Sequence, residues 1–198
     1  MLEYETTART KGYNNIVGVD EAGRGPLAGP VVAAAVLLAP NSQFEGLDDS
    51  KKLSPKAREG FFPIIKELAL GYGIGIIDVE TIDEINILQA ALLAMKYAVE
   101  ALPEKPNLLL IDGNKCIDTE VEQWTIVKGD SLSQSIAAAS VLAKVTRDKL
   151  MVEYHKQFPQ YAFDKHKGYG TRLHRDLIRE HGPCPIHRRT FKGVMEFI

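Results

Sequence analysis

The chain has 198 residues, of which 45% are hydrophobic and 25% charged, and its formal net charge is −2, values that are ordinary for a soluble globular protein. Its polar N-terminus is not that of a signal peptide, and the longest apolar run, Val31 to Ala39, is far too short to span a membrane. The two cysteines, Cys116 and Cys184, lack the spacing of a zinc site or a disulfide framework. We therefore expect free thiols, a cytoplasmic protein and no membrane partner.

The charges are divided unevenly along the chain. Residues 1–140 contain 12 Lys and Arg against 20 Asp and Glu, a net charge of −8, whereas residues 141–198 contain 12 against 6, a net charge of +6, and all five histidines. An acidic part beside a basic part suggests a cation site next to a surface that binds a polyanion. A basic face that is merely solvated would give the same composition, so charge alone leaves both interpretations open.

Hydrophobic patterning predicts five strands, each a short run of apolar and β-branched residues. They span residues 16–20, 31–38, 72–78, 107–112 and 124–127. About ten residues connect the first two strands, too few for the usual helical crossover, so we expect this pair to be antiparallel. The nearly continuous apolar run before Asp112 suits a strand that is covered on both faces.

Helices are predicted between and after these strands. The first begins at Ser54, the N-cap, with Pro55 at its first position, and ends at Gly71. The second begins at Thr81, where Glu84 completes a capping box. Its apolar residues recur at steps of three and four and so predict one buried stripe: Ile85, Leu88, Leu92, Met95, Val99 and Leu102.

A long helix is expected from about Ser131 to Gln157, and its Ala137-Ala138-Ala139 segment would allow close approach to a sheet. The rest of the chain suggests loops and a short helix from about Thr171 to His181. Strands that alternate with helices indicate an α/β layered structure.

Acidic residues follow the predicted strands at the edge where ligands collect in α/β sheets. Asp20 and Glu21 end the first strand, and Asp112 ends the buried one. Because neighbouring strand residues point to opposite faces, Glu21 can join Asp20 only if the chain turns at once, which the glycines after it permit. Asp130, just before the long helix, is a fourth candidate.

Asp148 competes with Asp130 for the fourth position. The two lie roughly 27 Å apart along one helix, at about 1.5 Å per residue, so they cannot share a site. Asp130, after the last strand, is better placed. Each carboxylate also has an ordinary interpretation: Asp130 as a helix N-cap, Asp112 as a turn aspartate, and Asp20 with Glu21 as exposed turn residues.

Carboxylates that converge are costly unless a cation joins them. At about 6 Å and an effective dielectric constant near 20, each like-charged pair repels by roughly 3 kcal/mol. Divalent cations reverse that sign, and ligands that are all oxygen favour Mg²⁺ or Mn²⁺ over zinc. Two such ions, about 4 Å apart, can activate a water and stabilise the leaving oxygen in phosphodiester cleavage.

Several segments, in order, resemble the signature motifs of the bacterial ribonuclease HII family. The first and most specific is VGVDEAGRGPLAGP, from Val17 to Pro30. The others are Asp49 to Leu53, Ile111 to Gly113, Lys128 to Asp130, Ser135 to Asp148, Lys167 to Thr171, and Gly182-Pro183 with His187 to Phe191. The resemblance covers about residues 15–193 and implies a ribonuclease H-like fold, a five-stranded mixed sheet flanked by helices with a helical C-terminal region.

The resemblance implies one domain, residues 15–198, after an N-terminal tail of residues 1–14, with residues 159–198 covering the substrate. The implied enzyme is an endonuclease that hydrolyses the RNA strand of RNA–DNA hybrids. It also cuts 5′ to ribonucleotides embedded in duplex DNA, as a step in DNA repair, and leaves 3′-hydroxyl and 5′-phosphate ends. Two divalent ions, Mn²⁺ or Mg²⁺, would be its cofactors, and we expect a monomer.

The resemblance also assigns site residues. The metal-binding and catalytic carboxylates would be Asp20, Glu21, Asp112 and Asp130. The ribonucleotide sensor would consist of the backbone of Gly23, Arg24 and Gly25 together with Tyr169. A 2′-hydroxyl is the feature that marks RNA within DNA, and a glycine loop lets backbone groups approach it closely. Tyr169 could stack on a sugar or base, or be simply an exposed loop tyrosine.

Basic residues in the motifs are predicted phosphate contacts, although any one of them could be only a surface charge: Arg24, Lys51, Lys144, Lys167 and Arg188. His166 and His187 are expected to hydrogen-bond backbone or phosphate groups. The alternatives are a related nuclease, such as type HIII or a resolvase, and a catalytically silent nucleic-acid-binding protein with this fold. The short segment before the first strand disfavours the extra N-terminal domain of type HIII, and the intact carboxylates disfavour a silent protein.

Overall fold

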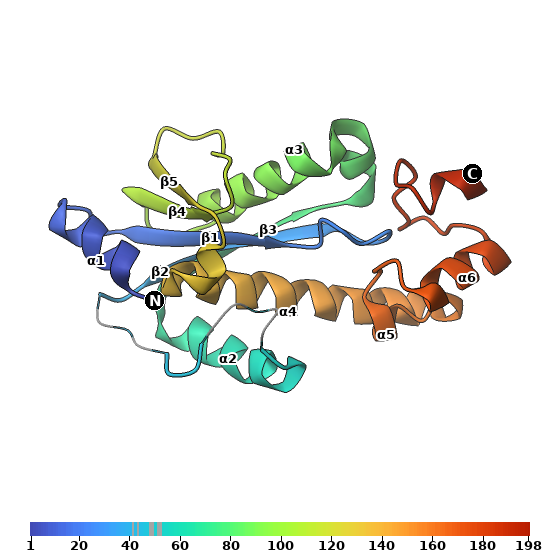
Figure 1. The fold of residues 1–198 in the computed structure, drawn as a ribbon, viewed down its shortest axis with the longest axis horizontal. Coiled ribbons are helices and arrows are strands. Elements are labelled where there is room, and N and C mark those ends of the chain that lie inside the picture. Colours follow the sequence, from blue (N-terminus) through green and yellow to red (C-terminus); the bar gives the residue numbers. More distant parts are fainter. Residues whose placement is uncertain (41, 43, 48–49, 51–52) are drawn as a thin grey trace.

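The computed structural model describes residues 1–40, 42, 44–47, 50 and 53–198 and contains one five-stranded sheet (Figure 1). Its strands are β1 (Ile16–Ala22), β2 (Val31–Leu38), β3 (Ala69–Ile77), β4 (Leu108–Asp112) and β5 (Glu122–Ile126). Their order in the sheet is β3-β2-β1-β4-β5. β2 is antiparallel to β1 and β3, whereas β1, β4 and β5 run parallel. The predicted mixed sheet and the antiparallel first pair are therefore confirmed.

Helices cover both faces of the sheet (Figure 1). α3 (Val79–Glu100) packs on one face, and α4 (Gln134–Gln157) with α2 (Pro55–Leu68) packs on the other. Residues of β2 alternate between the two layers, because successive strand side chains point to opposite faces. Ala35 thus joins the core under α3, and Ala34 joins the core under α4.

A glycine brings α4 into backbone contact with β1. A Cβ atom added at Gly18 would lie 2.1 Å from the carbonyl carbon of Ser135. The Ala137–Ala139 segment is fully buried in the same layer, which confirms its predicted close approach to the sheet. The first turn of α4 is therefore held against β1 at Gly18, two residues before Asp20.

Some predicted helix boundaries were wrong. α3 begins after Asp78, whose carboxylate accepts a hydrogen bond from the Thr81 N–H at 2.9 Å, so Asp78 rather than Thr81 is the N-cap. Asn86 has a φ of 68° and kinks the helix. The predicted stripe is largely confirmed: Met95 and Val99 are buried, and Ile85, Leu92 and Leu102 are partly buried against the same core. Alanines of α3 that were not predicted are buried beside them. α2 ends at Leu68, and Gly71 lies inside β3.

The first residues, predicted as a tail, contain helix α1 (Glu3–Thr10), which packs against the start of α4. Glu5 is buried, and its Oε1 accepts hydrogen bonds from the hydroxyl groups of Ser133 and Ser135, both at 2.7 Å. The N–H of Gln134 donates to the carbonyl of Met1. α1 is therefore part of the packed structure, while the division between residues 1–14 and 15–198 stays a prediction.

The C-terminal region lies beyond one end of the sheet, beside the end of α4 (Figure 1). It contains the short helices η2 (Pro159–Tyr161), α5 (Phe163–His166), α6 (Arg172–His181) and η3 (Met195–Phe197). The Leu27 N–H donates to the Gly168 carbonyl at 2.8 Å, which joins this region to the loop after β1. Cys116 and Cys184 are free thiols, as predicted. Of the helices in the described chain, none is long and apolar enough to cross a membrane.

Candidate active site

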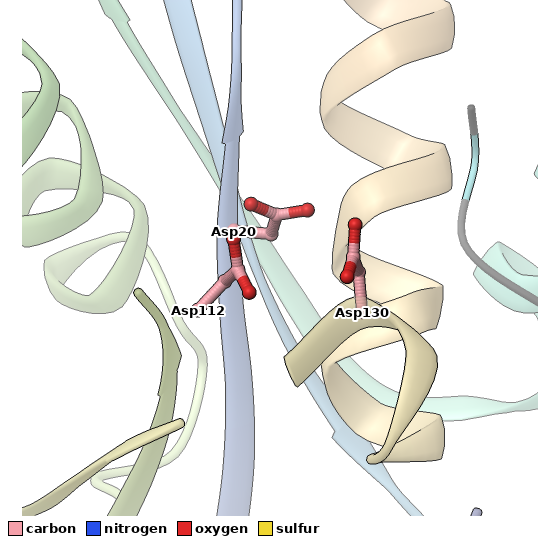
Figure 2. A group of neighbouring side chains, drawn as sticks. All are labelled: Asp20, Asp112 and Asp130. Carbon is pink, nitrogen blue, oxygen red and sulfur yellow. The ribbon is translucent and has the colours of Figure 1, made fainter. Parts of the chain in front are cut away.

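Three aspartates from separate segments meet above the carboxyl ends of two neighbouring strands (Figure 2). β1 and β4 are parallel, and their register pairs Val19 with Ile111, so Asp20 and Asp112 lie next to each other. Side chains alternate between the two faces along each strand, and both aspartates lie at positions whose side chains point toward α4. One carboxylate oxygen each from Asp20, Asp112 and Asp130 lies within 4.8 Å of the other two.

Asp130 reaches this group from η1 (Gly129–Ser131), a short turn between β5 and α4. Ser133 caps α4, because its hydroxyl accepts a backbone hydrogen bond in the first turn at 3.3 Å. The alternative interpretation of Asp130 as the helix N-cap is therefore wrong. The Gly129 N–H donates to Asp112 Oδ1 at 2.7 Å, which holds the turn beside the strand end.

Asp20 is only 2% exposed. Its Oδ1 accepts a hydrogen bond from the Glu21 N–H at 2.7 Å, and the Ser140 hydroxyl also donates to its carboxylate. Burial, followed by the charges of Glu21 and Asp112, raises the pKa of Asp20 well above its ordinary value. The ionised carboxylate is thus unfavourable in the protein alone and would be favoured by a nearby cation.

The donor set fits a hard divalent cation. All three side chains offer carboxylate oxygens, the ligands that Mg²⁺ and Mn²⁺ prefer. Like charges about 5 Å apart repel by roughly 3 kcal/mol at an effective dielectric constant near 20, and a cation between them turns that repulsion into attraction. Over the described residues, no other group of three His, Cys, Asp or Glu side chains lies close enough to share an ion. The site can therefore bind a divalent cation and use it on a phosphate ester.

Glu21 is not part of this group of three. β1 continues to Ala22, so the strand alternation sends the Glu21 side chain away from the α4 face. Its Oε1 lies 3.3 Å from Nη1 of Arg24, in a partly exposed ion pair. Glu21 remains close enough for its charge to raise the pKa of Asp20. The structure thus brings three of the four predicted carboxylates together, and a ligand role for Glu21 stays a prediction.

The two segments predicted to sense a ribonucleotide lie side by side. A Cβ atom added at Gly25 would lie 4.0 Å from Cε1 of Tyr169. Tyr169 is 42% exposed, and Lys144 Nζ lies 5.5 Å from the centre of its ring. Gly23 has a φ of +103°, and a Cβ there would lie 2.1 Å from Nε of Arg147, so only glycine fits. An exposed aromatic ring and a closely packed glycine loop therefore lie beside each other.

A cavity of about 480 Å³ adjoins Tyr169 between α2, α4 and the C-terminal region. Its basic lining residues are Arg58, Lys144, Lys149, Lys165 and Lys167. Lys144 Nζ forms an ion pair with Asp148 at 2.7 Å. Asp148, the rival candidate for the fourth carboxylate, is therefore paired with a lysine and lies outside the carboxylate cluster. Glu59, Asp148 and Glu153 also line the cavity. Lys144 and Lys167 thus border a hollow of mixed charge with an excess of basic residues, and their phosphate contacts stay predictions. Lys51 lies outside the described residues.

Arg188 does not present its side chain to a ligand, so the prediction of a phosphate contact was wrong. The residue is 0% exposed. Its guanidinium donates five hydrogen bonds, all to backbone carbonyls between residues 23 and 29. A guanidinium has five N–H groups, so none is left for a phosphate.

Two residues that support the site were not predicted. Ser140, which donates to Asp20, lies 2.7 Å from the Ser50 hydroxyl oxygen. A hydroxyl residue directly after the Ala137–Ala139 segment, on the buried side of the helix, is the signal that could have identified it. Arg147 lies seven residues further along α4, is 0% exposed, and donates to the Lys167 carbonyl at 2.9 Å. A charged residue at a buried position of a mainly apolar helix face was the corresponding signal.

Three histidines form a buried cluster behind Tyr169. His174 Nδ1 lies 3.0 Å from the Tyr169 carbonyl oxygen, and its Nε2 lies 3.0 Å from Nε2 of His187. Backbone N–H groups donate to Nδ1 of both His166 and His187. Each of these acceptor nitrogens must be unprotonated, so the network requires neutral rings. The prediction that His166 and His187 hydrogen-bond the backbone is confirmed.

We expect the free energy of unfolding to fall when the pH drops from about 6.5 toward 4. Burial lowers the pKa of His174 to about 3 and that of His187 to about 4. As the pH falls, the unfolded chain therefore binds protons at these histidines before the folded chain does. The two histidines contribute their full stability above the ordinary histidine pKa, and this contribution is lost as the pH falls toward their pKa values in the folded protein. The expected loss at about pH 5 is about 2 kcal/mol per histidine.

Urea unfolding at about pH 7.5 and about pH 5 measures this loss. The raised pKa of Asp20 makes the folded protein more stable as the pH falls, opposite to the effect of the histidines. The test therefore compares variants rather than the wild type alone. In His187→Asn the difference between the two pH values should change by about 2 kcal/mol. His181→Gln, at an exposed histidine, should keep the wild-type difference. If the free energy of unfolding depends on pH equally in His187→Asn and wild type, His187 is not a source of the loss of stability.

The family and its relatives agree with this geometry. The sequence model of the ribonuclease HII family matches residues 17–194. A ribonuclease HII of Geobacter sulfurreducens is 54% identical over 196 residues, covering 99% of this chain and 90% of that protein. A ribonuclease HII of Bacillus pumilus is 52% identical over 198 residues, covering 100% of this chain and 78% of that protein.

The fold has a counterpart among solved structures. The ribonuclease H2 of Pyrococcus horikoshii superposes with a TM-score of 0.77 at 25% identity, covering 92% of this chain and 96% of that one. The predicted ribonuclease H-like fold is thereby confirmed. With a family match that spans nearly the whole chain and half of its residues shared with relatives, this protein belongs to the ribonuclease HII family and is a metal-dependent nuclease acting on RNA–DNA hybrids.

Proposed function

We propose that this enzyme also cuts duplex DNA on the 5′ side of a single embedded ribonucleotide, leaving a 3′-hydroxyl and a 5′-phosphate. Asp20, Asp112 and Asp130 would hold two divalent cations, Mg²⁺ or Mn²⁺, with Glu21 as a further ligand. Such a cut is the first step in removing ribonucleotides from DNA, a form of DNA repair.

The observation that carries the proposal is the closeness of the glycine loop and Tyr169 to the carboxylates. Glu21, which follows Asp20, pairs with Arg24, and a Cβ atom added at the next residue, Gly25, would lie 4.0 Å from the Tyr169 ring. A nucleotide whose phosphate lies on the carboxylate cluster would therefore have a glycine backbone and an aromatic ring beside its sugar. Backbone groups at glycine can approach a 2′-hydroxyl, the group that distinguishes RNA from DNA.

Each part of the site would have its own task. Bound divalent cations would polarise the scissile phosphate and lower the pKa of the attacking water. The three aspartates would hold the reacting phosphate in place through those cations, and Lys144 and Lys167 would contact phosphates of the flanking duplex. A loop that hydrogen-bonds the 2′-hydroxyl can reject the deoxy analogue by roughly 10⁴–10⁵. No protein side chain is needed as a nucleophile.

Cleavage of matched duplexes tests the proposal. The substrates are a duplex with one ribonucleotide, the same duplex made wholly of DNA, and an RNA–DNA hybrid, each with Mg²⁺, with Mn²⁺ or with a chelator. We expect one cut, 5′ to the ribonucleotide, only when a divalent cation is present, and no cut in the all-DNA duplex. Cleavage of the hybrid without cleavage at the single ribonucleotide would refute the proposal while leaving the family activity intact.

The same assay separates the alternatives. A silent nucleic-acid-binding protein would bind these duplexes without cutting any of them in any metal. A resolvase would cut branched DNA, which has no ribonucleotide. A monomeric state and a cytoplasmic location remain predictions, which gel filtration with light scattering and cell fractionation would check.

A further inference from the structure

Two buried arginines hold the loop of residues 23–30, here called the sensor loop, from behind. Arg188 donates five hydrogen bonds of 2.6 to 3.0 Å to four loop carbonyls, those of Gly23, Arg24, Pro26 and Gly29. Arg147 donates to two more, those of Ala28 and Pro30, at 3.0 and 2.9 Å. Both arginines are 0% exposed. The loop therefore turns most of its carbonyl groups toward two guanidinium groups in the interior.

This arrangement is costly if its only purpose is packing. Among the residues that the structure describes, neither guanidinium forms an ion pair with a carboxylate. Burial lowers the pKa of Arg147 to about 10 and that of Arg188 to about 9, so both are charged at neutral pH. A buried charge without a counter-ion is unfavourable, and apolar side chains of similar volume often pack as well or better. The two cations therefore call for a role that apolar residues could not fill.

The carbonyl contacts determine where the loop amides point. No peptide bond among the described residues is cis, so the C=O and N–H of each peptide unit point in opposite directions. Arg188 draws the carbonyls of Gly23 and Arg24 inward, which turns the N–H groups of Arg24 and Gly25 outward. Both residues are exposed, and in the described part of the chain neither N–H has a hydrogen-bond partner.

We propose that Arg188, assisted by Arg147, is a positioning residue for ribonucleotide recognition, which holds the N–H groups of Arg24 and Gly25 outward as paired donors to the 2′-hydroxyl oxygen. Adjacent outward N–H groups are a recurrent receptor for electron-rich oxygens. The two buried charges add positive potential behind the donors. A cation is suited to this position because one guanidinium can bind four carbonyls at once, which no apolar side chain can do. The inference rests on the proposed function, in which the sensor loop contacts the ribonucleotide.

Binding measurements on a slowly cleaving background test this role. In the Asp112→Asn protein, fluorescence anisotropy compares the affinity for a duplex with one ribonucleotide and for the same duplex made of DNA. Adding Arg188→Met should lower the preference for the ribonucleotide by about tenfold or more, because the donors lose their alignment. Affinity for the all-DNA duplex should stay within about threefold. Retention of the preference, or equal loss of affinity for both duplexes, would overturn the proposal.

Two further variants separate positioning from folding. Arg188→Lys keeps the buried charge but has only three donors, so it should fold and still lose the preference. Ile65→Ala, in the α2 core away from the sensor loop, destabilises the protein and should keep the preference. A folded Arg188→Lys protein with the parental preference would contradict the proposal, whatever happens to Arg188→Met.

An amide readout keeps this test independent of the proposed function. Inorganic phosphate serves as a probe of the two donors in ¹H–¹⁵N spectra. We expect the Arg24 and Gly25 amide signals of the parent protein to shift on phosphate titration, and those of Arg188→Lys to shift by less than about a third as much. Absent shifts in the parent, or equal shifts in both proteins, would overturn the positioning role. A parent with these shifts and no ribonucleotide preference would instead show that the proposed function is wrong.

Discussion

Asp112→Asn should reduce cleavage of an RNA–DNA hybrid by about a thousandfold or more, because cation ligation contributes several kcal/mol of transition-state stabilisation. Asparagine keeps the oxygen that accepts the Gly129 N–H, a 2.7 Å hydrogen bond that holds η1 in place. It replaces the other carboxylate oxygen by an amide nitrogen, which is a poor ligand for a hard cation. The variant should therefore fold and bind the hybrid normally while losing turnover.

Single-turnover cleavage and hybrid affinity, measured together, check this expectation. Asp118→Asn is the matched control, because that carboxylate is exposed and pairs with Lys96 at 2.7 Å, outside the cluster. The control should retain wild-type turnover. In metal-free buffer, Asp112→Asn should be more stable than wild type, since one like charge has left the cluster. Turnover of Asp112→Asn within about tenfold of wild type would show that Asp112 holds no catalytic ion.

Gly18→Ala should destabilise the protein by about 3 kcal/mol or more, at the upper end of the cost of overpacking. The added Cβ would lie 2.1 Å from the carbonyl carbon of Ser135 and 2.3 Å from the backbone nitrogen of Ile136. Both neighbours are backbone atoms, so relief requires α4 to move away from β1. Because Asp20 follows on β1 and Asp130 precedes α4, the same movement would separate two ligands of the cation site.

Urea unfolding and Mn²⁺ affinity measure the two effects of Gly18→Ala. Gly60→Ala in α2 is the control: a Cβ there meets nothing within 4 Å, and alanine is favoured over glycine in a helix by about 1 kcal/mol. The control should be as stable as wild type or slightly more so and should bind Mn²⁺ normally. A Gly18→Ala protein with wild-type stability would show that the β1–α4 backbone contact is not as close as described here.

The strand ends that carry the site could be predicted because they depend on local pattern. The apolar runs before Asp20 and Asp112 mark buried strands, and parallel pairing of β1 with β4 then places these aspartates together. Asp130 was identified by its place between the last strand and the long helix. Glu21 could not be settled, because its direction depends on whether β1 turns after Asp20, and the strand instead continues to Ala22.

The prediction for α3 missed the alanines of its buried face, because their packing depends on glycines in the facing strand. Cβ atoms added at Gly73 and Gly75 of β3 would lie 2.0 Å from the carbonyl oxygens of Ala98 and Ala94. The helix approaches the sheet through these glycines, so Ala94 and Ala98 are buried together with Met95 and Val99 of the predicted stripe. A search for large apolar residues at helical spacing cannot detect a fit made by small residues on both elements.

Arg188 was beyond sequence reasoning for a different physical reason. Its hydrogen bonds join residues 159 to 165 positions apart along the chain. A basic residue beside another basic residue, as in Arg188-Arg189, is typical of an exposed phosphate-binding surface. Only the folded chain reveals that one of the two is buried against backbone carbonyls.

The central claim is that Asp20, Asp112 and Asp130 together form one divalent-cation site. Titration of Mn²⁺ into the metal-free protein, followed by the electron paramagnetic resonance of free Mn²⁺, tests it most directly. The affinity should fall by about tenfold or more in Asp20→Asn and stay unchanged in Asp148→Asn, whose carboxylate pairs with Lys144. Equal Mn²⁺ affinity in wild type and Asp20→Asn would contradict the claim.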